Sequence, residues 1–231
     1  MVCFDILTIF PKIFDGFLQE SFIKKAIQKK KIKIRVWNLR DFAQDKRKTV
    51  DDKPYGGGLG MVLKIEPIFF ALKKIAKIKI EKGKCKFKKG QKIIFFTPRG
   101  QIFNQKLATF LSKQKQIIFI CGRYEGVDER VAKYLSNMRI SLGNFDLMGG
   151  EVPAMAVIEA VTRLIPGVIG KEDFLKERKI KHGFVEFPQY TRPAIFSPKK
   201  GVFWKVPKVL LSGNHKKIEE WRQKRKIILE K

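Results

Sequence analysis

The stretch QIIFICGRYEGVDERVAKYLSNMRISLG, residues 116–143, decides the fold. It begins and ends with short apolar runs, 116–121 and 138–143, that have the length of buried strands. Between them, residues 127–135 carry apolar side chains at 127, 131, 134 and 135, a spacing typical of a helix. A strand, a helix and a second strand in this order predict parallel pairing, because a parallel connection needs a crossover.

The same alternation continues on both sides of this stretch. Further strand-like runs occupy 4–10, 32–37 and 92–97. Helical spacing marks 66–80, 105–111 and a segment that begins near Glu151 and is closed by Pro166 and Gly167. The sequence therefore predicts an α/β fold with a mostly parallel sheet.

The alternation stops near residue 169, which predicts the end of a first domain at 1–169. Residues 170–183 are charged and poor in apolar side chains, a composition typical of a flexible linker. Residues 184–231 then predict a second, smaller domain with a helix over 215–229, for which Asn214 is the expected N-cap.

Composition limits the class of protein. The chain has 231 residues, of which 44% are hydrophobic, and this amount of apolar surface is enough for a globular core. Lys and Arg number 50 against 22 Asp and Glu, a formal net charge of +28. Solubility needs a net charge of only about 2 to 8 in a small domain, so the excess predicts a polyanionic partner, nucleic acid above all.

The cysteines predict a reducing compartment. Cys3, Cys85 and Cys121 are odd in number and show no C-x-x-C spacing, and only two His accompany them, so neither a disulfide framework nor a zinc site is predicted. The apolar runs are far shorter than the roughly 20 residues that span a bilayer. We therefore expect a cytoplasmic protein without a membrane segment.

Three glycine-containing runs, TPRG (97–100), CGRYEG (121–126) and LGNFDLMGG (142–150), each follow a predicted strand. Open parallel sheets bind ligands at the carboxyl ends of their strands, so the three runs are expected to share one pocket. Glu125, between two glycines, favours a functional role, whereas Asp128 and Glu129 favour a salt-bridged helix start. The loop PYGGGLGM (54–61) lacks phosphate-loop spacing and fits a flexible turn and a ligand loop equally well.

Longer motifs carry a resemblance to a known family. DFAQDKRKTVDDKPYGGGLGM, ICGRYEGVDERV, SLGNFDLMGGEVPAMAVIEAVTRLIPGVIG, FPQYTRP and VPKVLLSGNHKKIEEWR occur in this order. They resemble the bacterial tRNA (guanine-37-N1)-methyltransferases of the SPOUT superfamily over nearly the whole chain. The resemblance implies transfer of a methyl group from S-adenosylmethionine to N1 of guanine 37, next to the anticodon.

The resemblance also implies an architecture that periodicity does not predict. It implies a deep trefoil knot in the N-terminal domain, a homodimer with active sites at the subunit interface, and a small helical C-terminal domain that binds tRNA. The family is reported to need Mg²⁺, although no residue cluster here is predicted to ligate a metal. The cofactor-binding positions that the motifs imply are Pro98, Gly122, Tyr124, Glu125, Leu142, Gly143, Asn144, Phe145, Asp146, Leu147, Gly149, Gly150 and Pro153.

Catalysis at guanine N1 needs a base for the N1 proton and a cation near O6. Arg163 alone would be interpreted as a helix-end or solvated residue, but the resemblance places it at the family's catalytic arginine. The family's catalytic aspartate position holds Arg178, which cannot act as a base. Glu177 beside it and Asp173 five residues earlier are the candidate bases, with Glu177 favoured.

Two alternatives stay open at this point. One is a SPOUT methyltransferase that acts on another RNA position. The other is a catalytically impaired RNA-binding homologue, which Arg178 at the base position favours.

Overall fold

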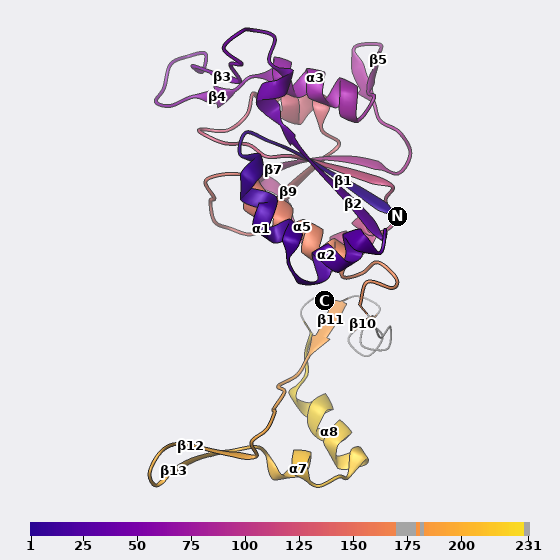
Figure 1. The fold of residues 1–231 in the computed structure, drawn as a ribbon, viewed down its shortest axis with the longest axis vertical. Coiled ribbons are helices and arrows are strands. Elements are labelled where there is room, and N and C mark those ends of the chain that lie inside the picture. Colours follow the sequence, from indigo (N-terminus) through magenta and orange to yellow (C-terminus); the bar gives the residue numbers. More distant parts are fainter. Residues whose placement is uncertain (170–178, 181–182, 229–231) are drawn as a thin grey trace. The chain divides into compact units, whose positions relative to one another are not determined.

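The computed structural model describes residues 1–169, 179–180 and 183–228. The chain divides into two compact units, Met1–Glu172 and Asp173–Lys231. A five-stranded parallel sheet forms the centre of the first unit (Figure 1). Every neighbouring pair in this sheet is parallel, which confirms the predicted pairing. In spatial order the strands are β2 (Ile32–Asn38), β1 (Val2–Thr8), β8 (Gln116–Ile120), β7 (Gln91–Ile102) and β9 (Met138–Ser141).

Helices cover both faces of the sheet, as Figure 1 shows with α3 on one side and α1, α2 and α5 on the other. One face carries η1 (Pro11–Phe14), α1 (Asp15–Gln19), α2 (Ser21–Gln28), α4 (Gln105–Leu111) and α5 (Glu151–Thr162). The other carries η2 (Leu39–Phe42), α3 (Ile65–Ile75) and the π-helical turn η3 (Val131–Leu135). Burial of both sheet faces explains why the strands are continuous apolar runs rather than alternating ones.

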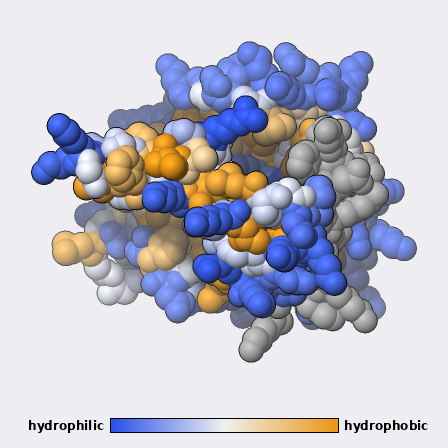
Figure 2. All heavy atoms as spheres, turned by 90° about the horizontal axis from the view of Figure 1, so that it is seen from below, coloured by the Kyte–Doolittle hydropathy of each residue, from blue (hydrophilic) through white to orange (hydrophobic). Residues whose placement is uncertain are grey.

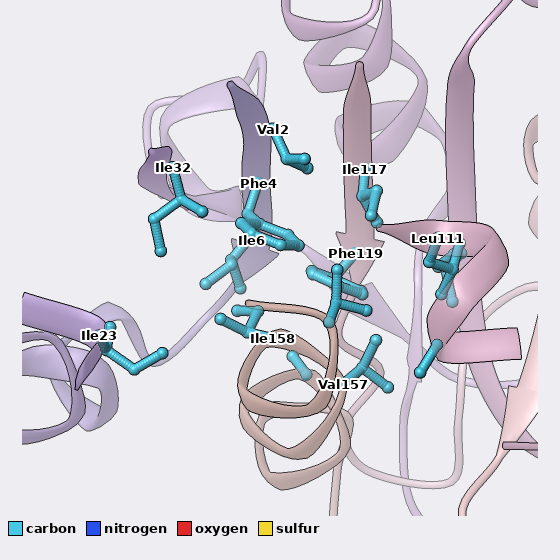
Figure 3. Close-up of a cluster of buried hydrophobic side chains, with 14 of the residues drawn as sticks. Val2, Phe4, Ile6, Ile23, Ile32, Leu111, Ile117, Phe119, Val157 and Ile158 are labelled. Atoms are coloured by element: carbon cyan, nitrogen blue, oxygen red, sulfur yellow. The ribbon is translucent and has the colours of Figure 1, made fainter. Parts of the chain in front are cut away.

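Helix α5 is central to the packing of its face. Ala154, Val157, Ile158 and Val161 are fully buried and follow the spacing i, i+3, i+4, i+7, so they form one side of the helix. In Figure 3, Val157 and Ile158 point towards Phe4 and Phe119 of the sheet. The two phenylalanine rings stack with centroids 6.1 Å apart. Helix α5 therefore packs against β1 and β8 in the middle of the sheet. The strand that precedes it in the chain, β9, lies at the edge of the sheet.

The predicted helix over 66–80 is wrong at its end. Helix α3 stops at Ile75, and the chain then forms an antiparallel hairpin of β5 (Lys79–Glu81) and β6 (Lys84–Lys86). Gly83 at the turn has φ of +72°, which favours this reversal. The prediction for 127–135 starts too early, because helical structure begins at Glu129 and continues as the π-helical turn Val131–Leu135. A further short pair joins β3 (Asp51–Asp52) to β4 (Val62–Leu63).

The second unit contains helices α7 and α8 together with short strands that the sequence analysis did not predict. Its elements are β10 (Lys179–Ile180), β11 (Gly183–Glu186), β12 (Ile195–Lys199), β13 (Val202–Lys205), α7 (Lys208–Leu211), α8 (His215–Arg225) and β14 (Ile227–Ile228). The predicted cap is present, because the Asn214 side chain accepts a hydrogen bond from the amide of Lys217. Helix α8 ends at Arg225, four residues before the predicted end, where β14 pairs with β11.

None of the helices in the described residues is both long enough and apolar enough to cross a membrane.

Candidate active site

A cavity of about 390 Å³ opens at the carboxyl ends of β7, β8 and β9. It is lined by the three segments that follow those strands, as the glycine-containing runs predicted. The lining residues are Phe95–Arg99, Gly122–Val127, Ile140–Leu142, Phe145–Gly150 and Pro153. Small-molecule sites in proteins commonly have volumes of about 300 to 1,000 Å³, so a cofactor-sized ligand fits this space.

Eleven of the thirteen predicted cofactor positions lie in this lining, and only Gly143 and Asn144 do not. The amide of Gly143 instead donates to the Ser141 hydroxyl at 3.2 Å, which shapes the turn after β9. Asn144 is exposed beside the cavity wall. The structure therefore brings residues from 98 to 153 together around one cavity.

Strand β7 contributes to the cavity through an interruption of its pairing. Phe96 and Gln101 both align with Ile140 of β9, so residues 97–100 bulge out of the ladder. This bulge turns the TPRG segment, with Pro98 and Arg99, towards the cavity.

The loop after β8 is held from two directions. On one side, the Glu125 amide donates to the Met61 carbonyl at 3.0 Å and the Leu63 amide donates to the Gly126 carbonyl at 3.0 Å. On the other side, the Gly122 carbonyl accepts from the Gly150 amide at 3.1 Å. Backbone hydrogen bonds thus fix the GRYEG segment between the end of the glycine-rich loop and the start of α5.

Gly150 shows why glycine is required at the start of α5. A Cβ at this position would lie 2.7 Å from the Cα of Cys121, and backbone atoms cannot move aside as a flexible side chain could. The two chain segments can therefore approach this closely only without a side chain between them.

A buried carboxylate joins three elements behind the cavity. Glu151 is fully buried; its Oε1 accepts from the Thr8 hydroxyl at 2.6 Å, and its Oε2 accepts from Arg123 Nε at 2.9 Å. The Arg123 guanidinium also lies 4.9 Å from the centre of the Phe10 ring. Glu151 occupies the first turn of α5, where the helix dipole favours a negative charge. These partners offset the cost of burying the charge, so Glu151 links β1, the loop after β8 and α5.

The pairing of Arg123 with Glu151 was not predictable from the sequence, because no local spacing connects residues 28 positions apart. The sequence offered only one indication of a role for Glu151, namely that an acidic residue is favourable in the first turn of a helix.

The charges on the cavity wall differ in their partners. Arg99 and Arg123 line the cavity, but each forms a salt bridge, Arg99 with Glu129 at 2.7 Å and Arg123 with Glu151. Glu125 and Asp146 also line it, and neither forms a salt bridge with any described residue. The wall therefore presents two carboxylates, which suit a cationic ligand.

The interpretation of Asp128 and Glu129 as charge-paired residues is confirmed. Arg130 donates to both oxygens of Asp128, and these hydrogen bonds lower the pKa of the Asp128 carboxyl. Glu129 pairs with Arg99 and lies 4.0 Å from Arg139. Both carboxylates thus have structural partners next to the cavity.

Cys121 lies behind the loop but is not a nucleophile. Its side chain is buried, and burial raises the pKa of the thiol well above its usual value, with a further contribution from the Glu151 carboxylate. The thiol therefore stays protonated at neutral pH and unreactive.

Arg163 does not lie at this cavity within one chain. Arg163 is the exposed C-cap residue of α5, and the cavity is at the opposite, N-terminal end of that helix. Twelve residues at about 1.5 Å each separate the two ends by about 18 Å. Glu177 and Asp173 lie outside the described residues. Among the described residues there is no group of three or more His, Cys, Asp or Glu side chains that could hold a metal ion.

Comparison with known proteins gives a consistent result over nearly the full chain. A family model described as tRNA (Guanine-1)-methyltransferase TrmD matches residues 2–229. A tRNA (guanine-N(1)-)-methyltransferase of Dictyoglomus turgidum is 49% identical over 224 residues, covering 97% of this chain and 84% of the relative. One from Clostridioides difficile is 42% identical, covering 99% and 94%. The crystal structure of tRNA (m1G37) methyltransferase from Aquifex aeolicus superposes with a TM-score of 0.74 at 42% identity, covering 95% of this chain and 87% of that one.

Proposed function

This chain belongs to the tRNA (guanine-1)-methyltransferase family, and from that premise we propose which of its residues carry the reaction. It is an enzyme that methylates N1 of guanine 37 in tRNA. The methyl donor that we propose is S-adenosylmethionine, bound in the cavity at the carboxyl ends of β7, β8 and β9.

The lining of the cavity fits this donor. Backbone groups at the glycines and the apolar side chains of Pro98, Leu142 and Leu147 suit a planar base, which needs hydrogen bonds at its edge and apolar contact on its faces. Glu125 and Asp146 complement its positively charged amino and sulfonium groups. When bound, S-adenosylmethionine supplies an electrophilic methyl group. We assign its binding to the eleven lining positions named above and, at the turn after β9, to Gly143 and Asn144.

The protein's own groups must handle the proton and the charge of guanine. N1 of guanine carries a proton, so methylation there requires a base to accept it and a cation near O6 as negative charge develops. We propose Arg163 as that cation. We propose Glu177 as the base, with Asp173 as the alternative.

The position of Arg163 carries the proposal of a homodimer. An arginine about 18 Å along α5 from the cavity cannot serve the cavity of its own chain without unwinding a buried helix. A second copy related by two-fold symmetry can supply it, and each subunit then completes the other's site.

The path of the chain around the cavity supports the proposed trefoil knot. Strand β9 pairs with β7, while α5 packs beneath β1 and β8, so residues 142–150 must return across the ends of β7 and β8. There, Gly150 lies against the backbone of Cys121 and Gly122, and the loop that contains these residues is bonded on its other side to Met61 and Leu63. We propose that this crossing passes through the loop. Such threading is otherwise close to absent in proteins.

We propose further that the N-terminal unit holds the catalytic domain and the C-terminal unit binds tRNA, with the linker near 170–183 between them. The cytoplasm is the proposed location, because tRNA is there. We propose no step for Mg²⁺, since the described residues contain no group of three or more His, Cys, Asp or Glu side chains that could hold it.

One experiment tests the proposed donor and target together. The protein is incubated with labelled S-adenosylmethionine and tRNA transcripts that carry G or A at position 37, and the nucleosides are analysed. We expect labelled 1-methylguanosine only from the G37 transcript. Label at another nucleotide, or no label, would contradict the proposal.

A further inference from the structure

The hairpin of β12 and β13 in the C-terminal unit exposes an unusual set of side chains. Its sequence, IFSPKKGVFWK (195–205), contains three aromatic residues, and every residue of both strands is exposed. Phe196 is 51% exposed, Phe203 57% and Trp204 63%. Figure 2, which views the molecule from below relative to Figure 1, shows hydrophobic side chains next to hydrophilic ones on this face. Exposed apolar clusters of this kind mark interaction sites.

The hairpin has a defined geometry despite its exposure. Phe196 pairs with Trp204 across the strands, and the Ser197 hydroxyl hydrogen-bonds the carbonyls of Lys199 and Val202 at 3.1 and 3.0 Å. Gly201 allows the turn with φ of +82°. The aromatic side chains therefore have fixed places on the hairpin.

The two faces of the hairpin differ. Paired residues lie on the same face, and the Phe196 and Trp204 rings are 5.8 Å apart with their planes tilted by 42°. Phe203 is the neighbour of Trp204 in the strand, so its side chain points to the opposite face. Only the first face carries an aromatic pair.

Positive charge lies next to this aromatic face. Lys199 and Lys200 lie at the turn, whereas Lys205, the other neighbour of Trp204 in β13, points to the opposite face; residues 195–205 contain no acidic side chain. None of the three lysines forms a salt bridge with a described residue. A protein partner that buried the rings would have to neutralise these lysines, whereas RNA supplies bases for the rings and phosphates for the lysines.

We propose that the Phe196–Trp204 face of this hairpin is a stacking platform for an unpaired base of the tRNA. In this arrangement the base lies on the Trp204 ring, and Lys199 and Lys200 contact neighbouring phosphates. That the RNA is tRNA rests on the proposed function; the stacking itself follows from the exposed rings.

The test compares the dissociation constants of three variants for a tRNA transcript. Loss of one base stack weakens binding by about 10- to 100-fold, so we expect this for Trp204→Ala. Trp204→Phe keeps a stacking ring and should restore most of the affinity. Phe203→Ala is the matched control, because it removes an equally exposed ring from the same strand on the other face, and it should bind nearly as the unmodified protein does. Equal thermal midpoints would show that each variant is folded.

Salt dependence and a duplex RNA separate stacking from charge. Trp204→Ala should leave the slope of log Kd against log salt unchanged. The double variant Lys199→Gln, Lys200→Gln should make this slope smaller, by about 0.7 to 0.9 for each phosphate that the two lysines neutralise in the unmodified protein. Binding to a blunt RNA duplex of similar length should not change in Trp204→Ala, because its bases are paired and stacked.

Unchanged tRNA affinity in Trp204→Ala would overturn the platform, and so would an equal loss in Phe203→Ala or an equal loss on duplex RNA. A change of oligomeric state in Trp204→Ala would also overturn it, since the rings would then face another copy of the chain. These measurements need no catalysis. If the unmodified enzyme made no 1-methylguanosine, the proposed function would fail while the stacking test remained decisive.

Discussion

At Gly150, the start of α5 rests on the backbone of Cys121, and we expect the smallest added group to disturb the cavity. Gly150→Ala forces a Cβ to within 2.7 Å of a Cα, and overpacking of this kind costs about 1 to 3 kcal/mol of unfolding free energy. The variant should unfold at a lower urea concentration. It should also bind S-adenosylmethionine at least about tenfold more weakly, because a loss of about 1.4 kcal/mol of binding free energy corresponds to a tenfold loss of affinity. Calorimetric titration and urea unfolding measure both effects.

Gly16→Ala is the matched control for this change. Gly16 lies in α1, and its added Cβ would have no heavy atom within 4 Å. Alanine in a helix is more stable than glycine by about 0.5 to 1 kcal/mol, so this variant should gain stability and keep its cofactor affinity. If both variants behaved alike, the close approach at Gly150 would not be what matters.

The proposed base is tested by exchanging Glu177 and Asp173 separately. Glu177→Gln removes the basicity of the side chain but keeps its shape. If Glu177 is the general base, the variant should carry out the methyl-transfer step about 10² to 10⁴-fold more slowly than the unmodified enzyme, with little change in its affinity for cofactor or tRNA. Asp173→Asn should then be nearly silent in single-turnover experiments. Reversed effects would assign the base to Asp173, and two silent variants would show that neither carboxylate is the base.

At the scale of elements, the buried Glu151 carboxylate holds β1, the loop after β8 and α5 together. Glu151→Ala leaves Arg123 and the Thr8 hydroxyl without their partner, and breaking a buried pair in this way costs about 3 to 5 kcal/mol. Urea unfolding should show this loss.

Asp41→Asn is the comparison, because Asp41 pairs with Lys48 at 3.6 Å and both side chains are more than half exposed. An exposed pair of this kind is worth about 0 to 1 kcal/mol. A similar small effect for Glu151→Ala would mean that the three elements are held by packing alone.

The elements also show what sequence can and cannot predict. The five strands were predictable because they are continuous apolar runs of strand length, and the helix over 105–111 because its apolar residues recur at helical spacing; both features are properties of neighbours in the chain. The hairpin after Ile75 was missed although Lys and Ile alternate there with the period of a strand, because the helical spacing that begins at 66 was extended through it to residue 80. The strands of the C-terminal unit were missed because they are short and because one pairing, of β11 with β14, joins segments distant in the chain.

The cavity was largely predictable, because three glycine-containing runs follow three parallel strands whose carboxyl ends meet. The separation of Arg163 from the cavity was not, because it depends on the direction in which α5 leaves the sheet. Nor could spacing reveal the contact of Gly150 with Cys121, which joins segments 29 residues apart by chain numbering.

At the scale of the whole molecule, the net charge of +28 predicts that tRNA binding is mainly electrostatic. Log Kd for tRNA should rise with log salt at about 0.7 to 0.9 for each phosphate neutralised, while the affinity for S-adenosylmethionine should barely change. Filter binding at several salt concentrations measures the first and calorimetry the second. A flat profile for tRNA would show that the excess charge serves another purpose.

We propose that each active site combines the cavity of one subunit with Arg163 of the other, and mixing two inactive variants tests this arrangement. Arg163→Ala keeps an intact cavity, and Gly150→Arg keeps an intact Arg163. After mixing at equal concentrations and exchange of subunits, half of the dimers are hybrids with one complete site of two, so activity should recover to about a quarter of that of the unmodified enzyme. If the mixture stayed as inactive as its parts although hybrid dimers were present, or if the protein were strictly monomeric, the shared site would be contradicted.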